Sequence, residues 1–289
     1  MKILICGANG NVGRDLVYFL SKKFKIFAIY RNNKNELLKN KNVKWIKSDL
    51  KNDIKLDIKP DYIINCIATH TFSEKNKLID YYNSNLKSVS NIINFSKKKK
   101  VKRIINFSTV NVYGKISKKI LSEKNKFINP DIVGVTKFFG EELLRNNTLK
   151  YINLRLPGIL CIKNTKKYPI ISRLLEDLKK NKKITIINKN AKFNNVIDTF
   201  EISKIIEKII FHNKNLKSDT VNVCASRPIK LYKVLSMLIK KTNSISKINY
   251  LTKKNYSYSI SFNKLKKILN FNPCSTEKII ERNLYSRYS

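Results

Sequence analysis

The sequence predicts an α/β fold with a doubly wound parallel sheet, and two observations predict it. Short runs rich in Ile, Val and Phe alternate with longer helical stretches through the first half of the 289 residues. Continuous apolar runs are typical of strands that are buried on both faces of a parallel sheet. A glycine-rich turn also follows the first run and opens the first helix. Strands and helices in this order form right-handed crossovers, which cover both faces of the sheet with helices.

The periodicity of apolar residues predicts the elements in chain order. The predicted strands of the first half are residues 3–6, 26–30, 43–48, 62–67 and 104–108. The predicted helices of this half are residues 11–19 and about 80–97. In the less regular second half, we expect helices at about 136–146, 170–180, 201–211 and 232–241, and strands at 151–156 and 182–187. The last forty residues are polar and rich in lysine, and no element is assigned to them.

The glycine turn is the strongest functional signal. Gly7, Gly10 and Gly13 have GxxGxxG spacing between a predicted strand and a predicted helix. The first glycine makes the tight turn, the second lets the backbone reach a phosphate, and the third allows close packing of helix on strand. The helix N-terminus then offers its N–H groups and positive dipole end to a pyrophosphate. The turn therefore predicts a Rossmann domain that binds NAD or NADP. The residues between the glycines complete the predicted contacts: Asn9, Asn11 and Val12.

The ends of the next two strands indicate which dinucleotide is bound. Proteins that select NAD usually place an acid after the second strand for the ribose 2′-hydroxyl, whereas this chain has Arg31. An arginine would suit the 2′-phosphate of NADP, so the sequence favours NADP over NAD. The alternative is that Arg31 only stacks on the adenine. Asp49 and Leu50, after the third strand, would contact the adenine edge.

These elements predict one compact unit with two lobes. A Rossmann lobe would span residues 1–158, and a smaller α+β substrate lobe, residues 159–289, would close over a substrate. A strand near residues 221–224 would return to the Rossmann sheet. No apolar run approaches the roughly 20 residues that span a bilayer, so we expect a cytoplasmic protein without a membrane partner. The five cysteines form no CxxC pair and only two histidines are present, so we expect neither a metal site nor disulfides.

The net charge of +40 raises the alternative of a polyanion-binding protein. The 60 basic residues comprise 51 lysines and nine arginines, and Asn and Ile are also abundant. These residue types share AT-rich codons, which favours a bias of the genome, because nucleic-acid sites usually use arginine. We therefore do not expect a nucleic-acid partner. The densest cluster, residues 97–100 with Lys102 and Arg103, is predicted to be a solvated face at a helix end.

Further segments follow the glycine turn in a recognisable order. They are Asn65-Cys66-Ile67-Ala68, Asn85, the stretch from Ser108 to Gly114, Arg155-Leu156-Pro157-Gly158 and Asn195-Val196-Ile197-Asp198. Together they resemble the extended short-chain dehydrogenase/reductase family, nearest its NAD-dependent epimerase/dehydratase group, over nearly the whole chain. The resemblance implies that Thr109 is the catalytic Ser/Thr. It implies further cofactor contacts from Cys66, Ile67, Ala68, Asn85 and Pro157.

The resemblance breaks at the acid/base of the family. The Tyr-x-x-x-Lys motif of the family is here Val133-Gly134-Val135-Thr136-Lys137, so the lysine is present and the tyrosine is absent. In the family this tyrosine is the general acid/base, and the lysine lowers its pKa and binds the ribose hydroxyls. Valine cannot transfer a proton.

Three interpretations follow from Val133. Another group could substitute, namely Tyr113, His70 or Asp131, although these residues also suit turn packing, a surface loop and a helix cap respectively. Alternatively, the protein is catalytically degenerate and binds the cofactor without catalysis. In the third interpretation, substrate or water supplies the proton, since the hydride transfer itself belongs to the cofactor.

The resemblance implies a nucleotide-linked sugar as substrate. The reaction would be hydride-dependent epimerisation, dehydration or 4-keto-reduction, with Thr109, Lys137 and Tyr113 as the predicted catalytic residues. Arg155 or Arg173 could meet an anionic substrate, the alternative for each being an ordinary surface or core pair. The family also implies a homodimer through the helix before Lys100 and the helix that contains Lys137.

Overall fold

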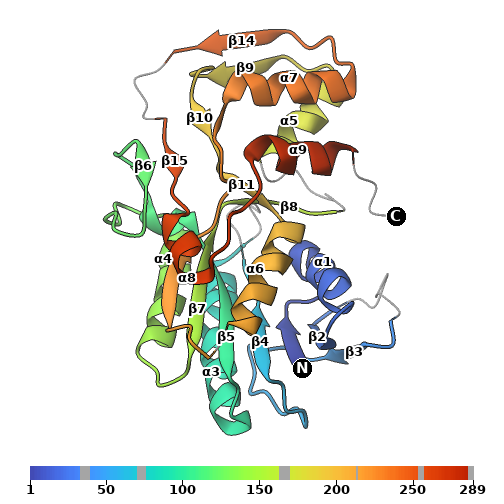
Figure 1. Ribbon diagram of the computed structural model, residues 1–289, viewed down its shortest axis with the longest axis vertical. Coiled ribbons are helices and arrows are strands. Elements are labelled where there is room, and N and C mark those ends of the chain that lie inside the picture. Colours follow the sequence, from blue (N-terminus) through green and yellow to red (C-terminus); the bar gives the residue numbers. More distant parts are fainter. Residues whose placement is uncertain (33–39, 70–75, 163–169, 213, 253–256, 286–289) are drawn as a thin grey trace. The chain divides into compact units, whose positions relative to one another are not determined.

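The computed structural model (Figure 1) describes residues 1–32, 40–69, 76–162, 170–212, 214–252 and 257–285. The chain forms two compact units. The first comprises Met1–Lys115, Lys126–Arg155 and Ser203–Val221, and the second comprises Ile116–Asn125, Leu156–Ile202 and Asn222–Ser289. The predicted division at residue 158 would place residues 116–125 in the first unit and residues 203–221 in the second. In the structure, residues 116–125 belong to the second unit and residues 203–221 to the first.

A seven-stranded sheet forms the centre of the first unit. Its strand order is β12-β7-β5-β4-β1-β2-β3. The strands are β1 (Lys2–Cys6), β2 (Lys25–Tyr30), β3 (Val43–Lys47), β4 (Tyr62–Asn65), β5 (Arg103–Thr109), β7 (Tyr151–Leu156) and β12 (Asp219–Asn222). β1 pairs in parallel with β2 and β4, and the pairs β2–β3 and β4–β5 are parallel as well. The strand order reverses between β1 and β4, where doubly wound folds bind their ligands. The predicted parallel Rossmann sheet is confirmed.

Helices cover the sheet, and the alternation of side chains along each strand explains how. On one face, Leu4, Ile63 and Ile104 form a cluster with Val89 and Ile92. The last two residues belong to α3 (Ser88–Lys99), which continues from α2 (Leu78–Tyr82) through a π-helical turn, η1 (Asn83–Lys87). Successive residues of a strand point to opposite faces, so this side of the sheet packs on α3. The single helix predicted at 80–97 is thus three consecutive segments.

The end of α1 (Asn11–Leu20) lies beside the part of α6 (Thr199–Phe211) that belongs to the first unit. Lys23 Nζ forms an ion pair of 2.7 Å with Glu207, and the rings of Phe24 and Phe211 are 6.1 Å apart. α6 therefore covers the sheet together with α1.

Two local predictions need correction. Helix α4 (Ile132–Arg145) begins four residues before the predicted start, because the Asp131 side chain caps it by accepting a hydrogen bond of 2.7 Å from Gly134 N. Arg103 is fully buried rather than part of a solvated face. Its guanidinium donates to the carbonyl oxygens of Tyr151 at 2.9 Å and of Leu216.

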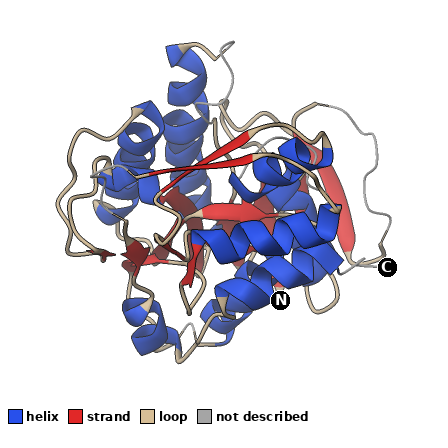
Figure 2. Ribbon diagram, turned by 90° about the horizontal axis from the view of Figure 1, so that it is seen from above, coloured by secondary structure: helices blue, strands red, loops and turns tan. Residues whose placement is uncertain are grey.

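The second unit is built from short paired strands and helices. The pairs are β6 (Ile120–Leu121) with β15 (Ser259–Ile260), β8 (Gly158–Leu160) with β11 (Val196–Asp198), β9 (Ile184–Ile187) with β14 (Ile248–Leu251), and β10 (Lys192–Phe193) with β13 (Ile229–Lys230). The helices are α5 (Ile170–Lys179), α7 (Leu231–Thr242), α8 (Asn263–Leu269) and α9 (Thr276–Tyr285). Figure 2 distinguishes the helices and strands of the chain by colour. Within the described ranges, no helix is both long enough and apolar enough to span a bilayer.

Candidate functional site

The glycine turn joins the end of β1 to α1, as the sequence predicts. Gly10 is the N-cap of α1, and its N–H donates to Gly7 O at 3.1 Å. Asn9 ties the turn to the end of β2, since its Nδ2 donates to Asn32 O at 3.0 Å. Arg14 Nε donates to Asn9 Oδ1 at 3.0 Å, which places a cation beside the turn. Arg14 is not among the predicted contacts, although a basic residue directly after the third glycine is a usable signal. The other predicted contacts here are Asn11 and Arg31, which are exposed, and Val12, which is half-buried.

Replacing Gly13 by alanine is expected to destabilise this turn. A Cβ at Gly13 would lie 2.2 Å from Gly7 O and 2.7 Å from Ala8 Cα, both backbone atoms. Overpacking of this kind typically costs about 1–3 kcal/mol and shifts the backbone, so we expect a lower melting temperature and loss of NAD binding. Thermal denaturation without cofactor checks this. Gly10→Ala is the matched control, because its Cβ would only come within 3.4 Å of Gly7 O. Equal melting temperatures for the two variants would contradict the prediction.

Residues after β3 and β4 supply the next predicted contacts. Asp49 Oδ1 accepts a hydrogen bond of 3.2 Å from Lys51 N, and Leu50 is buried. Ile67 and Ala68 are half-buried. Burial raises the pKa of the Cys66 thiol to about 12, so it is neutral at physiological pH.

The side chain of Asn85 connects η1 to α4 by a hydrogen bond. It is fully buried in η1, and its Nδ2 donates to Thr136 Oγ1 on α4 at 2.9 Å. Its Oδ1 accepts from Thr69 N at 3.2 Å. Both ends of this amide are therefore engaged within the protein.

Lys137 lies at the carboxyl ends of the central strands. Its Nζ donates to Ile67 O at 2.7 Å, just after β4, and to Phe107 O at 2.9 Å, on β5. Burial lowers its pKa to about 8, while nearby Cys66 and Glu141 oppose this shift. An ammonium has three donors, and two of them have acceptors among the described residues, which fix the lysine on the sheet.

The lowered pKa of Lys137 predicts a pH dependence of stability. Between about pH 8 and the ordinary lysine pKa of 10.5, the unfolded chain holds a proton on this residue that the folded chain has released. The free energy of unfolding then rises with pH across this window, by at most about 3 kcal/mol. Subtracting the profile of Lys137→Met, measured by urea denaturation, isolates this contribution from those of the other lysines. Parallel profiles for the two proteins would contradict the prediction.

The Tyr position of the family's motif is filled by a packed valine. Val133 is 2% exposed, in the first turn of α4. This turn packs on the 3₁₀ helix η2 (Val110–Tyr113), because a Cβ at Gly134 would lie 2.3 Å from Asn111 O. Thr109, half-buried at the end of β5, accepts a hydrogen bond of 3.2 Å from Asn111 N.

Two of the three residues that could substitute for the tyrosine, Asp131 and Tyr113, form hydrogen bonds within the protein. Asp131 binds Gly134 N with Oδ1 and accepts from Asn111 Nδ2 with Oδ2 at 3.1 Å, as a helix cap does. Tyr113 is buried, and its hydroxyl accepts a hydrogen bond of 2.9 Å from Arg155 Nη1. Both environments favour the structural explanations of these residues. His70 lies outside the described residues.

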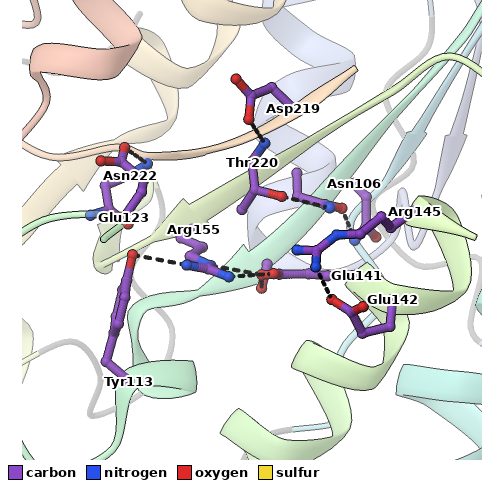
Figure 3. Close-up of polar contacts among 12 residues, drawn as sticks. Asn106, Tyr113, Glu123, Glu141, Glu142, Arg145, Arg155, Asp219, Thr220 and Asn222 are labelled. Carbon is purple, nitrogen blue, oxygen red and sulfur yellow. Dashed lines mark hydrogen bonds and ion pairs between the residues drawn. The ribbon is translucent and has the colours of Figure 1, made fainter. Parts of the chain in front are cut away.

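Arg155 belongs to a buried charged network rather than to an anion site (Figure 3). Its Nε and Nη2 donate to the two carboxylate oxygens of Glu141, at 3.0 and 2.6 Å. Ser108 Oγ donates to the same carboxylate. With the hydroxyl of Tyr113, this network engages the guanidinium on several sides, as in the core-pair alternative. Arg173 is exposed on α5, and Pro157 is buried after β7.

No three His, Cys, Asp or Glu side chains are grouped to hold a metal ion in the part of the chain that the structure describes.

Comparisons with known proteins find a family model and related sequences that match this chain. The model of the NAD dependent epimerase/dehydratase family matches residues 3–224. GDP-6-deoxy-D-talose 4-dehydrogenase of Aggregatibacter actinomycetemcomitans is 24% identical over 82% of this chain and 79% of its own length. dTDP-D-glucose 4,6-dehydratase of Dictyostelium discoideum is 29% identical over 70% of this chain and 55% of its own length.

The fold also has close counterparts among solved structures. UDP-glucuronic acid 4-epimerase of Bacillus cereus in complex with NAD superposes with a TM-score of 0.83 at 21% identity, covering 100% of this chain and 97% of that one. UDP-glucose 4-epimerase of Thermotoga maritima with UDP-glucose gives 0.79 at 17% identity, covering 98% and 97%. These likenesses show the same fold. With the family match over most of its length, the chain belongs to the NAD-dependent epimerase/dehydratase family, within the extended short-chain dehydrogenases/reductases.

Proposed function

We propose that the protein is an NAD(P)-dependent oxidoreductase that acts on a nucleotide-linked sugar without a tyrosine acid/base. The observation that carries this proposal is Lys137, which is held by two backbone carbonyls at the carboxyl ends of β4 and β5. Burying a lysine is unfavourable unless its polar group is used, so a buried Lys137 in a chain with valine at position 133 favours a role in binding the ribose. The names of the four similar proteins all specify a nucleotide-linked sugar and chemistry at its position 4.

Each residue has a defined task in this proposal. The backbone at Gly10 and the N-terminus of α1 bind the pyrophosphate, and the third N–H of Lys137 orients the nicotinamide ribose. The bound dinucleotide supplies or accepts the hydride. Thr109 Oγ donates a hydrogen bond to the sugar oxygen at which charge develops. Because Val133 has no proton to give, the proton is exchanged with water or with the substrate.

NADP is the proposed form of the cofactor. Arg31 is exposed directly after β2. Arg14 is hydrogen-bonded to Asn9 of the glycine turn. Two guanidinium groups near the adenosine end would attract a 2′-phosphate.

The experiment is turnover with reduced cofactor. The purified protein is incubated with NADPH or NADH and with 4-keto sugars linked to UDP, GDP or dTDP, while the loss of reduced nicotinamide is followed. We expect turnover that is faster with NADPH, that is lost in Thr109→Ala and that is retained in Thr109→Ser. Absence of turnover with every pair would contradict the proposal. The second candidate, a cofactor-binding protein without dehydrogenase activity, is favoured by the buried Val133 and would then stand.

A homodimer through one apolar face of the first unit is also proposed. Leu78, Ile79 and Tyr82 of α2 and Val135 and Phe139 of the contacting helix α4 are exposed. Gathered apolar surface of this kind marks an interaction site. We expect Phe139→Asp to convert a dimer into a monomer in analytical ultracentrifugation. Ile245→Asp, which alters an exposed apolar residue of the second unit, should leave the dimer intact. A wild-type protein that is monomeric at micromolar concentration would contradict this prediction.

A further inference from the structure

A row of buried polar side chains crosses four neighbouring strands of the first unit. Asn65 of β4 lies opposite Asn106 of β5 in the sheet register, and its Nδ2 donates to Asn106 Oδ1 at 2.9 Å. Asn106 Nδ2 donates to Asn153 Oδ1 on β7 at 2.9 Å, and Asn153 Nδ2 donates to Thr220 Oγ1 on β12 at 3.0 Å. Figure 3 shows the hydrogen bond that Asn106 donates and the one that Thr220 accepts. We call these four residues the amide row.

Burying the side chains of the amide row is unfavourable unless they bond to one another, and each member depends on its neighbours in the row for hydrogen bonds. Its members are between 1% and 9% exposed. A buried amide without a partner is strongly disfavoured, whereas leucine could occupy a strand interior without that penalty. Each asparagine of the row except the first accepts from one neighbour and donates to the next. All three donations run from β4 towards β12, and hydrogen bonds aligned head to tail polarise one another.

The amide row separates two different layers on the same face of the sheet. Two residues before it along β4 and β5 lie Ile63 and Ile104, which belong to the apolar cluster under α3. Two residues after it along β5 and β7 lie Ser108 and Arg155, which bind Glu141. The row is therefore the boundary between the apolar core and the polar groups at the strand ends.

One end of the amide row reaches the loop after β4, which contains Ile67. Asn65 Oδ1 accepts a hydrogen bond of 3.2 Å from Ile67 N. The carbonyl oxygen of Ile67 accepts from Lys137 Nζ at 2.7 Å. The glycine turn lies against the same residue, because a Cβ at Gly7 would be 3.2 Å from Ile67 N. The backbone of Ile67 is thus held between the amide row, Lys137 and the glycine turn.

We propose that Asn65, Asn106 and Asn153 are positioning residues, which set the backbone at Ile67 and through it the place of Lys137. In this proposal the row acts through the backbone of Ile67 rather than by contact with the cofactor or the sugar. This inference rests on the proposed function, because it takes Lys137 as a ribose contact.

The decisive comparison is Asn106→Leu with Asn106→Asp. Leucine removes both hydrogen bonds of the central residue. Aspartate still accepts the hydrogen bond from Asn65. The amide of Asn153 can rotate so that its Nδ2 donates to the new carboxylate, and the Thr220 hydroxyl can then donate to Asn153 Oδ1. The two measurements are hydrogen exchange of the Ile67 amide, relative to that of the Ile64 amide, and the dissociation constant of NADP. At the end of the row that reaches Ile67, Asn65 loses one buried hydrogen bond, so we expect Asn106→Leu to raise the exchange ratio and the dissociation constant about fivefold to tenfold. Asn106→Asp should restore both.

Asn194→Leu is the matched control for loss of a buried amide. Asn194 belongs to the second unit, and its Nδ2 donates to Ala225 O at 3.0 Å and to Ile260 O at 2.8 Å. This variant should lower the melting temperature without changing the exchange ratio at Ile67. If Asn106→Leu does not fold, Thr220→Val removes only the last acceptor of the row and should change both quantities in the same direction by a smaller factor.

Three results would overturn the inference. They are an unchanged exchange ratio in the folded row variant, an unchanged NADP affinity despite faster exchange, and an equal change of both quantities in Asn194→Leu. Failure of the proposed function is recognised separately, because a wild-type protein that binds NADP but turns over no sugar rejects the activity and leaves the exchange results standing.

Discussion

Val133→Tyr is expected to raise the rate of sugar oxidation or reduction by about 10²–10⁴, the usual contribution of a positioned general acid/base. Position 133 is four residues before Lys137 and so lies on the same face of α4. A phenol there would meet a positive charge, which favours its ionised form. The measurement is kcat/KM with the sugar that the wild type turns over, or with the full panel of keto-sugars if it turns over none.

Val133→Phe is the control for bulk. Val133 is buried, so either ring must displace neighbours at a cost of about 1–3 kcal/mol in stability. Phenylalanine imposes the same crowding and has no proton to transfer. A rate increase of equal size in both variants would show that packing, rather than acid/base chemistry, limits the wild type.

Glu141→Ala is expected to lower the free energy of unfolding by about 3–5 kcal/mol. The carboxylate is fully buried and forms two hydrogen bonds with Arg155, whose charge would lose its compensation. The Ser108 hydroxyl would lose its acceptor as well. Urea denaturation of the apoprotein measures the loss.

The double variant Glu141→Leu with Arg155→Met separates the unpaired charge from the packing. Replacing a whole buried ion pair by apolar residues of similar volume is often neutral or stabilising, so most of the stability should return. A loss below about 1 kcal/mol in Glu141→Ala, or a double variant as unstable as the single one, would contradict this account.

The parts of the fold that depend on local periodicity were predictable. The expected strands at 3–6, 26–30 and 104–108 correspond to β1, β2 and β5 within one residue at each end. The glycine turn was equally accessible, because its spacing is itself the structural requirement. The start of α4 was misplaced by four residues, although Asp131 was noted as a helix cap, because the glycine in its first turn weakens the helical pattern.

The parts that depend on pairing between distant segments were not predictable. Nothing in the neighbourhood of Arg103 shows that carbonyl groups near residue 216 will bury it. Asn65, Asn106 and Asn153 likewise interrupt apolar strands that are far apart in the sequence, and only the strand order aligns them. In the last forty residues, α9 is docked by Arg282, which pairs with Asp198 at 3.0 Å far back in the chain. A single sequence contains no local signal for such partners.

The place of β12 at the edge of the sheet determines when the first unit can be completed during synthesis. β7 has its outer neighbour only once Asp219–Asn222 has left the ribosome, which at roughly 5–20 residues per second is several seconds after Leu156. Until then Asn153 and Arg103 lack their partners at Thr220 and Leu216. During this interval the nascent chain therefore has an unpaired strand edge at β7 and an incomplete amide row, and such edges can pair with other chains.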